Sequence, residues 1–102
     1  MDARAWGRWW RLEGQAGLRH VLNTLWNPIG PGLPEDEFDF VAGPIASLLF
    51  RDADRSQVAA LLAEHRVDHL GAGTDREADD RAAAAILAWY HSVRPRDANP
   101  TS

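Results

Sequence analysis

Apolar residues recur along this chain with a helical spacing. Between residues 18 and 26 they stand at i, i+3, i+4, i+7 and i+8, which is the spacing of one apolar helix face: Leu18, Val21, Leu22, Leu25 and Trp26. Pro28 is expected to end this helix, because the residue before a proline is driven out of the α region. No stretch alternates with a period of two for long enough to predict a strand.

A second helix is predicted to begin near Glu35, with Pro34 in its first turn. Gly43-Pro44 interrupts its apolar stripe, and a proline inside a helix removes a hydrogen bond and costs about 3 kcal/mol. We therefore expect either one kinked helix or a break with a restart at Pro44. The stripe consists of Phe38, Val41, Ile45, Leu48 and Leu49.

Capping patterns mark the starts of two further helices. Asp54 with Gln57, and Thr74 with Glu77, have the spacing of a capping box, in which each side chain bonds the backbone N–H of the other residue. The predicted inner face of the third helix consists of Val58, Leu61, Leu62 and His65. That of the fourth consists of Ala82, Ala83, Ile86, Leu87, Tyr90 and Val93.

The N-terminal stretch is rich in tryptophan. Trp6, Trp9 and Trp10 stand at i, i+3 and i+4, which would place them on one side of a short helix, although Gly7 and Gly14 weaken that prediction. The whole pattern predicts a small all-α domain of four helices, with an additional N-terminal helix or turn.

The length of 102 residues fits one domain. We divide the chain into a basic, Trp-rich N-terminal segment (1–14), a single helical domain (15–94) and a flexible polar tail (95–102). No apolar run is long enough to span a membrane, and the start of the chain lacks the features of a signal peptide. We therefore expect a cytoplasmic protein with no membrane contact.

Charge is distributed unevenly along the chain. Residues 1–19 and 81–102 each carry a balance of +2, whereas residues 20–80 carry four arginines against twelve carboxylates, a balance of −8. Such a segment repels phosphate backbones and suits a basic protein partner, so no nucleic-acid partner is expected. The partner-binding carboxylates that we single out are Glu35, Asp36, Glu37 and Asp39.

Arginines are interleaved with the N-terminal tryptophans. Trp and Arg are over-represented among the energetic anchors of protein interfaces, so Trp6, Trp9 and Trp10 are further candidates for partner binding or for a homodimer contact. Stacking on single-stranded nucleic acid is a weaker alternative, since the chain is acidic overall. The remaining alternative is that the three rings cover one end of the core.

Candidate metal and catalytic chemistry is sparse. His65 and His69 share a helix face at the i, i+4 spacing that can chelate zinc, but Arg66 stands where a metalloprotease carries its general base, and no third ligand is evident. A small metal- or ligand-binding domain that uses these two residues remains an alternative. The chain has no cysteine, no nucleophile elbow and no phosphate loop. We expect neither a cofactor nor enzymatic activity.

The stretch LWNPIGPGLPEDEFDFV is not required by any generic helix. It resembles a group of short bacterial all-helical proteins in which the first helix ends in Trp-Asp-Pro-Ile-Gly and a proline-containing loop leads to Glu-Tyr-Asp. The resemblance covers roughly residues 17–93. The matching residues are Trp26, Pro28, Ile29, Gly30, Pro34, Glu37, Phe38, Asp39, Phe40, Ile45, Leu48, Leu49, Leu70 and Gly71.

This resemblance implies a four-helix fold and, for function, a likeness to small acidic immunity proteins that are encoded beside bacterial toxins. Asn27 stands where those proteins carry Asp, Phe38 replaces their Tyr, and Gly43-Pro44 interrupts the second helix. The expectation that follows is a non-enzymatic protein that binds and neutralises a basic toxin through its acidic surface.

Overall fold

A computed structural model describes residues 3–26, 39–68 and 75–94 of the chain. Of these residues 92% are helical and none lies in a strand, which confirms the small all-α domain. Four helical segments are present in the described ranges. Within those ranges no helix is both long and apolar enough to cross a membrane.

The first segment is assembled from four consecutive pieces without a break. These are α1 (Ala3–Trp9), the π-helix η1 (Trp10–Gly14), α2 (Gln15–Val21) and the π-helix η2 (Leu22–Trp26). The other three segments are α3 (Asp39–Phe50), α4 (Arg55–Asp68) and α5 (Arg76–Val93).

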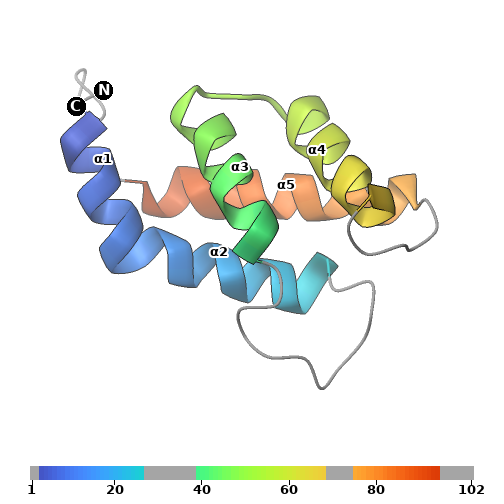
Figure 1. Cartoon of the computed structure of the whole chain (residues 1–102), viewed down its shortest axis with the longest axis horizontal. Helices are drawn as coiled ribbons and strands as arrows, with labels where there is room; N and C mark the ends of the chain where they lie inside the picture. The colour runs from blue at the N-terminus through green and yellow to red at the C-terminus, as the bar shows by residue number, and fades with distance from the viewer. Residues whose placement is uncertain (1–2, 27–38, 69–74, 95–102) are drawn as a thin grey trace.

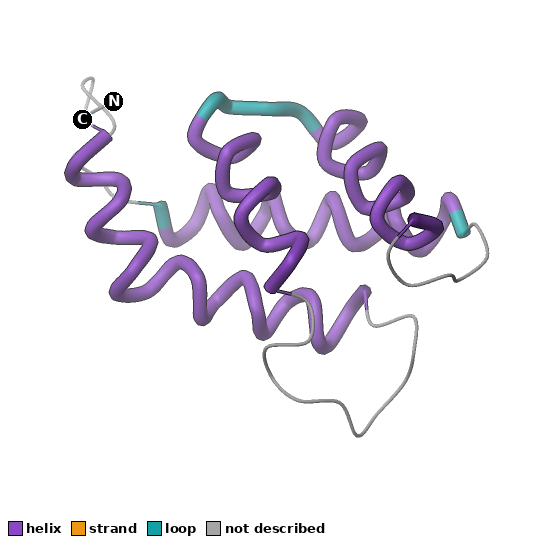
Figure 2. The backbone as a smooth tube through the Cα atoms, viewed as in Figure 1, coloured by secondary structure: helices purple, strands orange, loops and turns teal. Residues whose placement is uncertain are grey.

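The first segment and α5 form one layer of the fold, in which they run in opposite directions (Figure 1). The shorter helices α3 and α4 cross this pair, and α4 packs against both α3 and α5. The tube drawing shows the same arrangement with no strand in the described ranges (Figure 2). As a result, the core is enclosed between a pair of long helices and a pair of short ones.

The buried residues of the first segment are Trp6, Trp9, Gly14, Leu18, Leu22 and Trp26, and from Gly14 onward they follow a four-residue step. An α-helix has 3.6 residues per turn, so each step of four overshoots a full turn by about 40°. A π-helical turn, with its i→i+5 bonds, holds more residues and reverses that drift. The two π-helical pieces therefore keep the tryptophans and leucines on one side.

The same step accounts for the solvent side of this segment. Arg4, Arg8, Leu12, Ala16, His20 and Thr24 are exposed and stand four apart, and Ala3, Arg11, Glu13 and Leu25 are exposed as well. Leu25, which the sequence pattern placed on the apolar face, is 55% exposed. That prediction was wrong because it assumed an unbroken α-helix, whereas η2 shifts the angular position of every residue in the last turn.

Helix α3 is continuous from Asp39 to Phe50 with Pro44 inside it. The helix is therefore not broken at Gly43-Pro44, and of the two alternatives the single helix through both halves is correct. Gly43 and Pro44 are both exposed.

The capping box of α4 is present as predicted. The backbone N–H of Gln57 donates to Asp54 Oδ1 at 2.9 Å, and the backbone N–H of Asp54 donates to Gln57 Oε1 at 2.9 Å. For α5 the N-cap is Asp75, whose Oδ1 accepts from the N–H of Ala78 at 3.0 Å. The prediction of Thr74 was therefore one residue early.

The C-terminal end of α3 forms a Schellman motif. The N–H of Ala53 donates to the carbonyl of Leu48 at 3.0 Å, and that of Asp52 donates to the carbonyl of Leu49 at 3.1 Å. Asp52 adopts a φ of 58°, which is the left-handed conformation this motif requires. The chain thereby reverses toward α4 within four residues.

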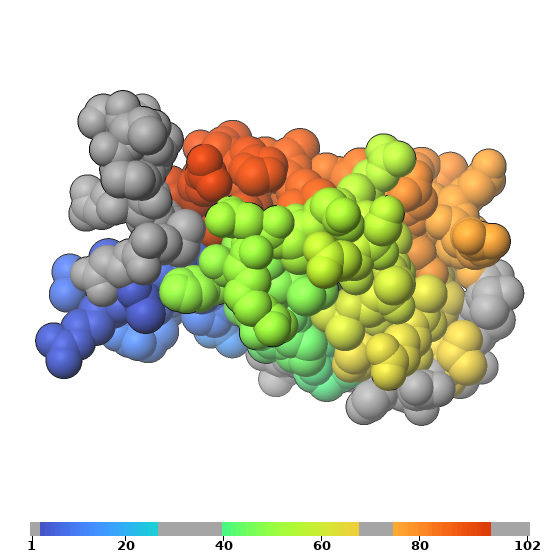
Figure 3. Space-filling view, turned by 90° about the horizontal axis from the view of Figure 1, so that it is seen from above, coloured from blue at the N-terminus to red at the C-terminus, as the bar shows by residue number. Residues whose placement is uncertain are grey.

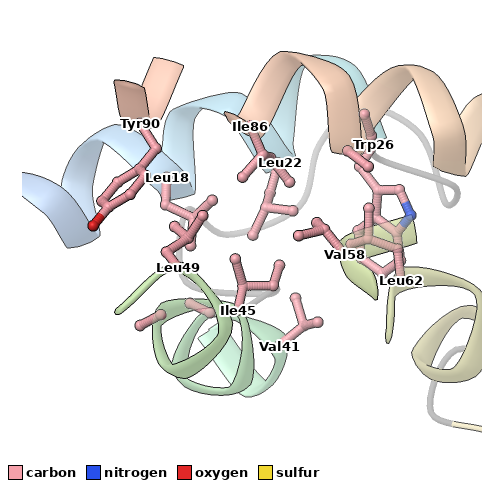
Figure 4. Close-up of a cluster of buried hydrophobic side chains, with 14 of the residues drawn as sticks. Leu18, Leu22, Trp26, Val41, Ile45, Leu49, Val58, Leu62, Ile86 and Tyr90 are labelled. Atoms are coloured by element: carbon pink, nitrogen blue, oxygen red, sulfur yellow. The ribbon is translucent and has the colours of Figure 1, made fainter. Parts of the chain in front are cut away.

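The core draws side chains from every helical segment, and Figure 4 shows its centre. Leucine and isoleucine from α2, α3 and α5 meet valine and leucine from α4. Each such side chain contributes about 1.5–3 kcal/mol when it is fully buried. The residues that are less than 2% exposed include Leu18, Leu22, Val41, Ile45, Leu49, Val58, Leu62, Ile86 and Tyr90.

Candidate functional site

The acidic segment singled out from the sequence falls largely outside the described residues. Glu35, Asp36 and Glu37 lie outside the described ranges, and the structure describes Asp39 only as the first residue of α3. Their role as partner-binding residues stays a prediction. Phe38, Leu70 and Gly71, which the sequence pattern also used, lie outside these ranges as well.

The N-terminal tryptophans pack into the core. Trp6 is 7% exposed and Trp9 8% exposed, whereas Trp10 is half-buried and stacks on Trp6 with ring centroids 5.6 Å apart. Trp6 Nε1 donates to the hydroxyl of Tyr90 at 2.9 Å. Of the alternatives weighed for this cluster, the structure favours the covering of one end of the core, and it leaves Trp6 and Trp9 little surface for a partner.

Two glycines let these rings approach the first segment closely. A Cβ atom at Gly14 would lie 2.8 Å from carbon atoms of both Trp9 and Trp10. At Gly17 it would lie 2.6 Å from Cζ2 of Trp89. Real Cβ atoms do not approach other heavy atoms so closely, so both positions need glycine for packing. Gly14, which weakened the prediction of an N-terminal helix, is therefore needed for the packing of that helix.

His65 is half-buried on α4 and already has a local partner. Its Nδ1 lies 3.0 Å from the carbonyl oxygen of Leu61, and its ring lies 5.8 Å from that of Phe40. His69 lies outside the described residues. In the described part of the chain, no three residues of the ligating types come together as a metal site. A metal centre at His65 therefore stays a prediction without structural support.

A buried polar centre joins three helices. Asp79 Oδ1, on α5, accepts from Trp26 Nε1 at 2.8 Å and from Arg66 Nε and Nη2 at 3.0 and 2.8 Å. Arg66 is 5% exposed and Asp79 2% exposed, so this is a buried ion pair. The guanidinium carbon of Arg66 also lies 5.7 Å from the centroid of the Trp26 ring, which is a cation–π contact.

Neither member of this pair was predicted to be buried or to belong to a site. The available signal was their phase, since Arg66 continues the four-residue step of Val58 and Leu62, and Asp79 precedes Ala83 by four residues. One positive and one negative residue on the inner faces of successive helices indicate a buried pair, because an uncompensated charge is rarely buried.

One oxygen of this centre has no hydrogen-bond donor. Asp79 Oδ2 is buried and accepts no hydrogen bond from the described part of the chain. A carboxylate oxygen has two lone pairs, and a buried acceptor without a donor costs about 1–3 kcal/mol. Such an atom in a native structure calls for an explanation, for example a bound water or ligand.

Asp79 also lines a groove between α4 and α5, two helices that lie side by side in Figure 3. The groove has a volume of about 460 Å³, within the range of small-molecule sites. Three alanines of α4 form its apolar wall, and charged residues of α5 line its other side. The lining residues are Ser56, Ala59, Ala60, Ala63, Arg76, Glu77, Asp79 and Asp80.

Comparison with known proteins identifies no relative. The chain matches no protein-family model, no curated protein and no solved structure.

Proposed function

We propose that this chain is a non-enzymatic interaction domain that binds a basic protein partner. The observation that carries the proposal is the balance of −8 across residues 20–80 of a chain whose two ends are positive. Charge complementarity of this kind accelerates association and selects partners by sign. The most specific form of the proposal is an immunity protein that neutralises a basic bacterial toxin.

Two observations support a binding role for the acidic residues. The segment that contains Glu35, Asp36 and Glu37 connects η2 to α3, and both of these helices have residues in the core. Exposed carboxylates in the described ranges add to the acidic surface at Asp54, Glu64, Asp75 and Glu77. Binding surfaces on connections between fixed elements are common in proteins.

The proposal is tested with a charge-reversed variant, Glu35→Lys/Glu37→Lys. Tagged wild-type and variant chains are used to capture the partner from the native host, at low and at physiological salt. We expect the wild type to retain a basic protein and the variant to lose it. Capture should also weaken as salt rises, because exposed charges are screened over about 8–10 Å.

A matched control is Asp2→Lys/Glu13→Lys, which changes the net charge by the same amount but lies in the basic N-terminal stretch, outside the acidic residues 20–80. It should retain the partner nearly as well as the wild type. If both variants lost the partner equally, the binding would depend on the overall charge of the chain and not on the acidic segment. Capture that neither reversal nor salt affects would refute the proposal.

A further inference from the structure

A hollow of about 450 Å³ lies between the start of α1 and the end of α3. Its volume falls within the range of small-molecule sites. Two aromatic rings border it, and the alanine side chains that also border it are too short to fill it. The lining residues are Ala3, Trp6, Ala46, Ser47, Phe50 and Arg51.

The aromatic part of this lining is held in place by contacts with other rings. Trp6 Nε1 donates to the hydroxyl of Tyr90 at 2.9 Å, and the Trp6 ring stacks on that of Trp10 with centroids 5.6 Å apart. The ring of Phe50 packs edge to face against Trp6, with centroids 5.4 Å apart. Because the one polar atom of these two lining rings already has a partner, they offer the hollow only apolar surface. A preformed apolar wall of this kind suits an aromatic group.

Arg51 supplies the charged part of the lining. It is exposed, and its Nε donates to the carbonyl of Ser47 at 3.2 Å. Among the described residues, none accepts a hydrogen bond from Nη1 or Nη2 of Arg51. The neighbouring carboxylate of Asp52 pairs instead with Arg94, at 3.7 Å. The bond to Ser47 therefore orients the guanidinium group and leaves its Nη donors for a ligand.

The surroundings of this guanidinium group favour an anion. Helix α1, which borders the hollow, contains Arg4 and Arg8 and no acidic residue. A guanidinium group can donate two parallel hydrogen bonds to one carboxylate. A phosphate group, with up to about two charges and three acceptor oxygens, would need more donors than one arginine supplies beside an apolar wall. The ligand whose two parts match this lining is therefore a carboxylate joined to an apolar group.

We propose that this hollow binds a small aromatic carboxylate. The carboxylate accepts from Nη1 and Nη2 of Arg51, and the aromatic ring of the ligand lies against Trp6 and Phe50. The apolar wall distinguishes this site from a single exposed arginine, which binds any anion weakly. The inference is independent of the proposed function, because it uses none of the carboxylates between residues 20 and 80 and concerns a ligand of the opposite charge.

The test uses the full chain with 3-phenylpropionate as the probe. Two analogues separate its parts, since 3-phenylpropionamide lacks the charge and acetate lacks the ring. The indole N–H of Trp6, the Nε–H of Arg51 and the backbone amides of Ala46 and Ser47 are followed by NMR at constant pH and ionic strength. We expect saturable shifts of all four signals with the probe. Each analogue should bind about tenfold more weakly or less.

The variant Arg51→Gln removes the charge from the lining. It should weaken binding of 3-phenylpropionate by about tenfold, because a charge-assisted hydrogen bond is roughly twice as strong as a neutral one. The matched control is Arg81→Gln, which makes the same change at an exposed position of α5 outside the lining. This control should bind the probe as the wild type does.

A second variant, Ser47→Leu, fills the hollow from an exposed position of α3 and keeps Arg51. It should also weaken binding by about tenfold or more, because the ring of the probe loses its space. Its control, Ser56→Leu, adds the same side chain at an exposed position of α4 outside the lining and should bind as the wild type does.

Any of four results would overturn the inference: no saturable shift at Trp6 or Arg51, equal affinities of Arg51→Gln and Arg81→Gln, equal affinities of Ser47→Leu and Ser56→Leu, or acetate bound as tightly as the probe. The last result would show that an exposed charge binds anions without the hollow. None of them bears on the capture of a basic partner through Glu35 and Glu37. The failure of either proposal is therefore distinguishable from the failure of the other.

Discussion

At the scale of single residues, two glycines of the first segment have opposite surroundings. Gly17 lies under the Trp89 ring, where a Cβ would be 2.6 Å from Cζ2, whereas a Cβ at Gly7 would meet only Arg11 Nη1 at 3.7 Å. Both lie in helical pieces, so both positions would gain helix propensity with alanine. A difference in stability between the two alanine variants would therefore report the packing around each position and not its helix propensity.

Gly17→Ala is expected to lower the free energy of unfolding by about 1–3 kcal/mol, because Trp89 has to move and the strain exceeds the gain in helix propensity. Gly7→Ala, as the matched control, should raise it by about 0.5–1 kcal/mol. Urea unfolding followed by tryptophan fluorescence measures both. Equal effects at the two positions would contradict the role given to the Trp89 contact.

At the scale of helices, the ion pair between Arg66 and Asp79 ties α4 to α5, and Trp26 adds η2 through the same oxygen atom. Burial of both charges is expensive, so the pair contributes less stability than its short distance suggests. Removal of only one of the two charged side chains should be strongly destabilising, since the other charge would remain uncompensated in the interior.

Arg66→Met should lower the free energy of unfolding by about 3–5 kcal/mol, because Asp79 is left buried without its cation. The double variant Arg66→Met/Asp79→Leu should recover most of that loss, since it removes both charges and keeps apolar volume. Urea titrations of the single and double variants give the coupling energy. A single variant within about 1 kcal/mol of the wild type would show that Asp79 does not depend on Arg66.

The helices themselves were largely predictable from local chemistry. Asp54 and Gln57 form the predicted capping box because that interaction depends on only four successive residues. Leu25 and Val93, by contrast, were placed on inner faces and are 55% and 41% exposed. The exposure of Leu25 depends on the path of the backbone through η2, and that of Val93 depends on where the neighbouring helix ends. Neither feature is encoded within one helical turn.

The candidate site was less predictable. The phase of Arg66 and Asp79 on their helices was the one local signal of their burial, and their pairing becomes evident only when α4 and α5 are packed together. Trp6 and Trp9 show the converse case, because interleaved arginines suggested an interface where the structure has a core. Charge near an aromatic residue indicates its environment only once tertiary contacts are known.

At the scale of the whole molecule, the two ends of the described chain are joined by the hydrogen bond from Trp6 in α1 to Tyr90 in α5. Burial raises the pKa of the Tyr90 hydroxyl above its usual value near 10, and Asp52 adds to the increase, while the Trp6 bond and Arg94 partly oppose it. The folded state therefore holds the phenol proton more firmly than the unfolded state does.

Stability is consequently expected to fall as the pH rises above about 10, because the unfolded chain then binds fewer protons than the folded one. The chain has one tyrosine, no cysteine and, as its sequence shows, no lysine, so Tyr90 is the only side chain that titrates near that pH. Unfolding titrations in urea at increasing pH measure the fall. The near-ultraviolet absorbance of tyrosinate reports its ionisation directly.

Tyr90→Phe provides the control for this dependence. It should be less stable than the wild type at neutral pH, since Trp6 Nε1 loses its acceptor at a cost of about 1–3 kcal/mol. Its stability should be nearly constant over the interval in which that of the wild type falls. An equal fall in both proteins would mean that some other group is responsible.

The four-residue step of the first segment also bears on how relatives of this chain can be recognised. An ordinary amphipathic helix has apolar residues at a mixed three-and-four spacing, whereas Gly14, Leu18, Leu22 and Trp26 are each four residues apart. Deletion of one residue inside η1 would rotate everything before it by about 100° and carry Trp6 away from Tyr90. Homologues that share this packing should therefore vary in the intervening residues but keep the number of residues between the first and last tryptophan.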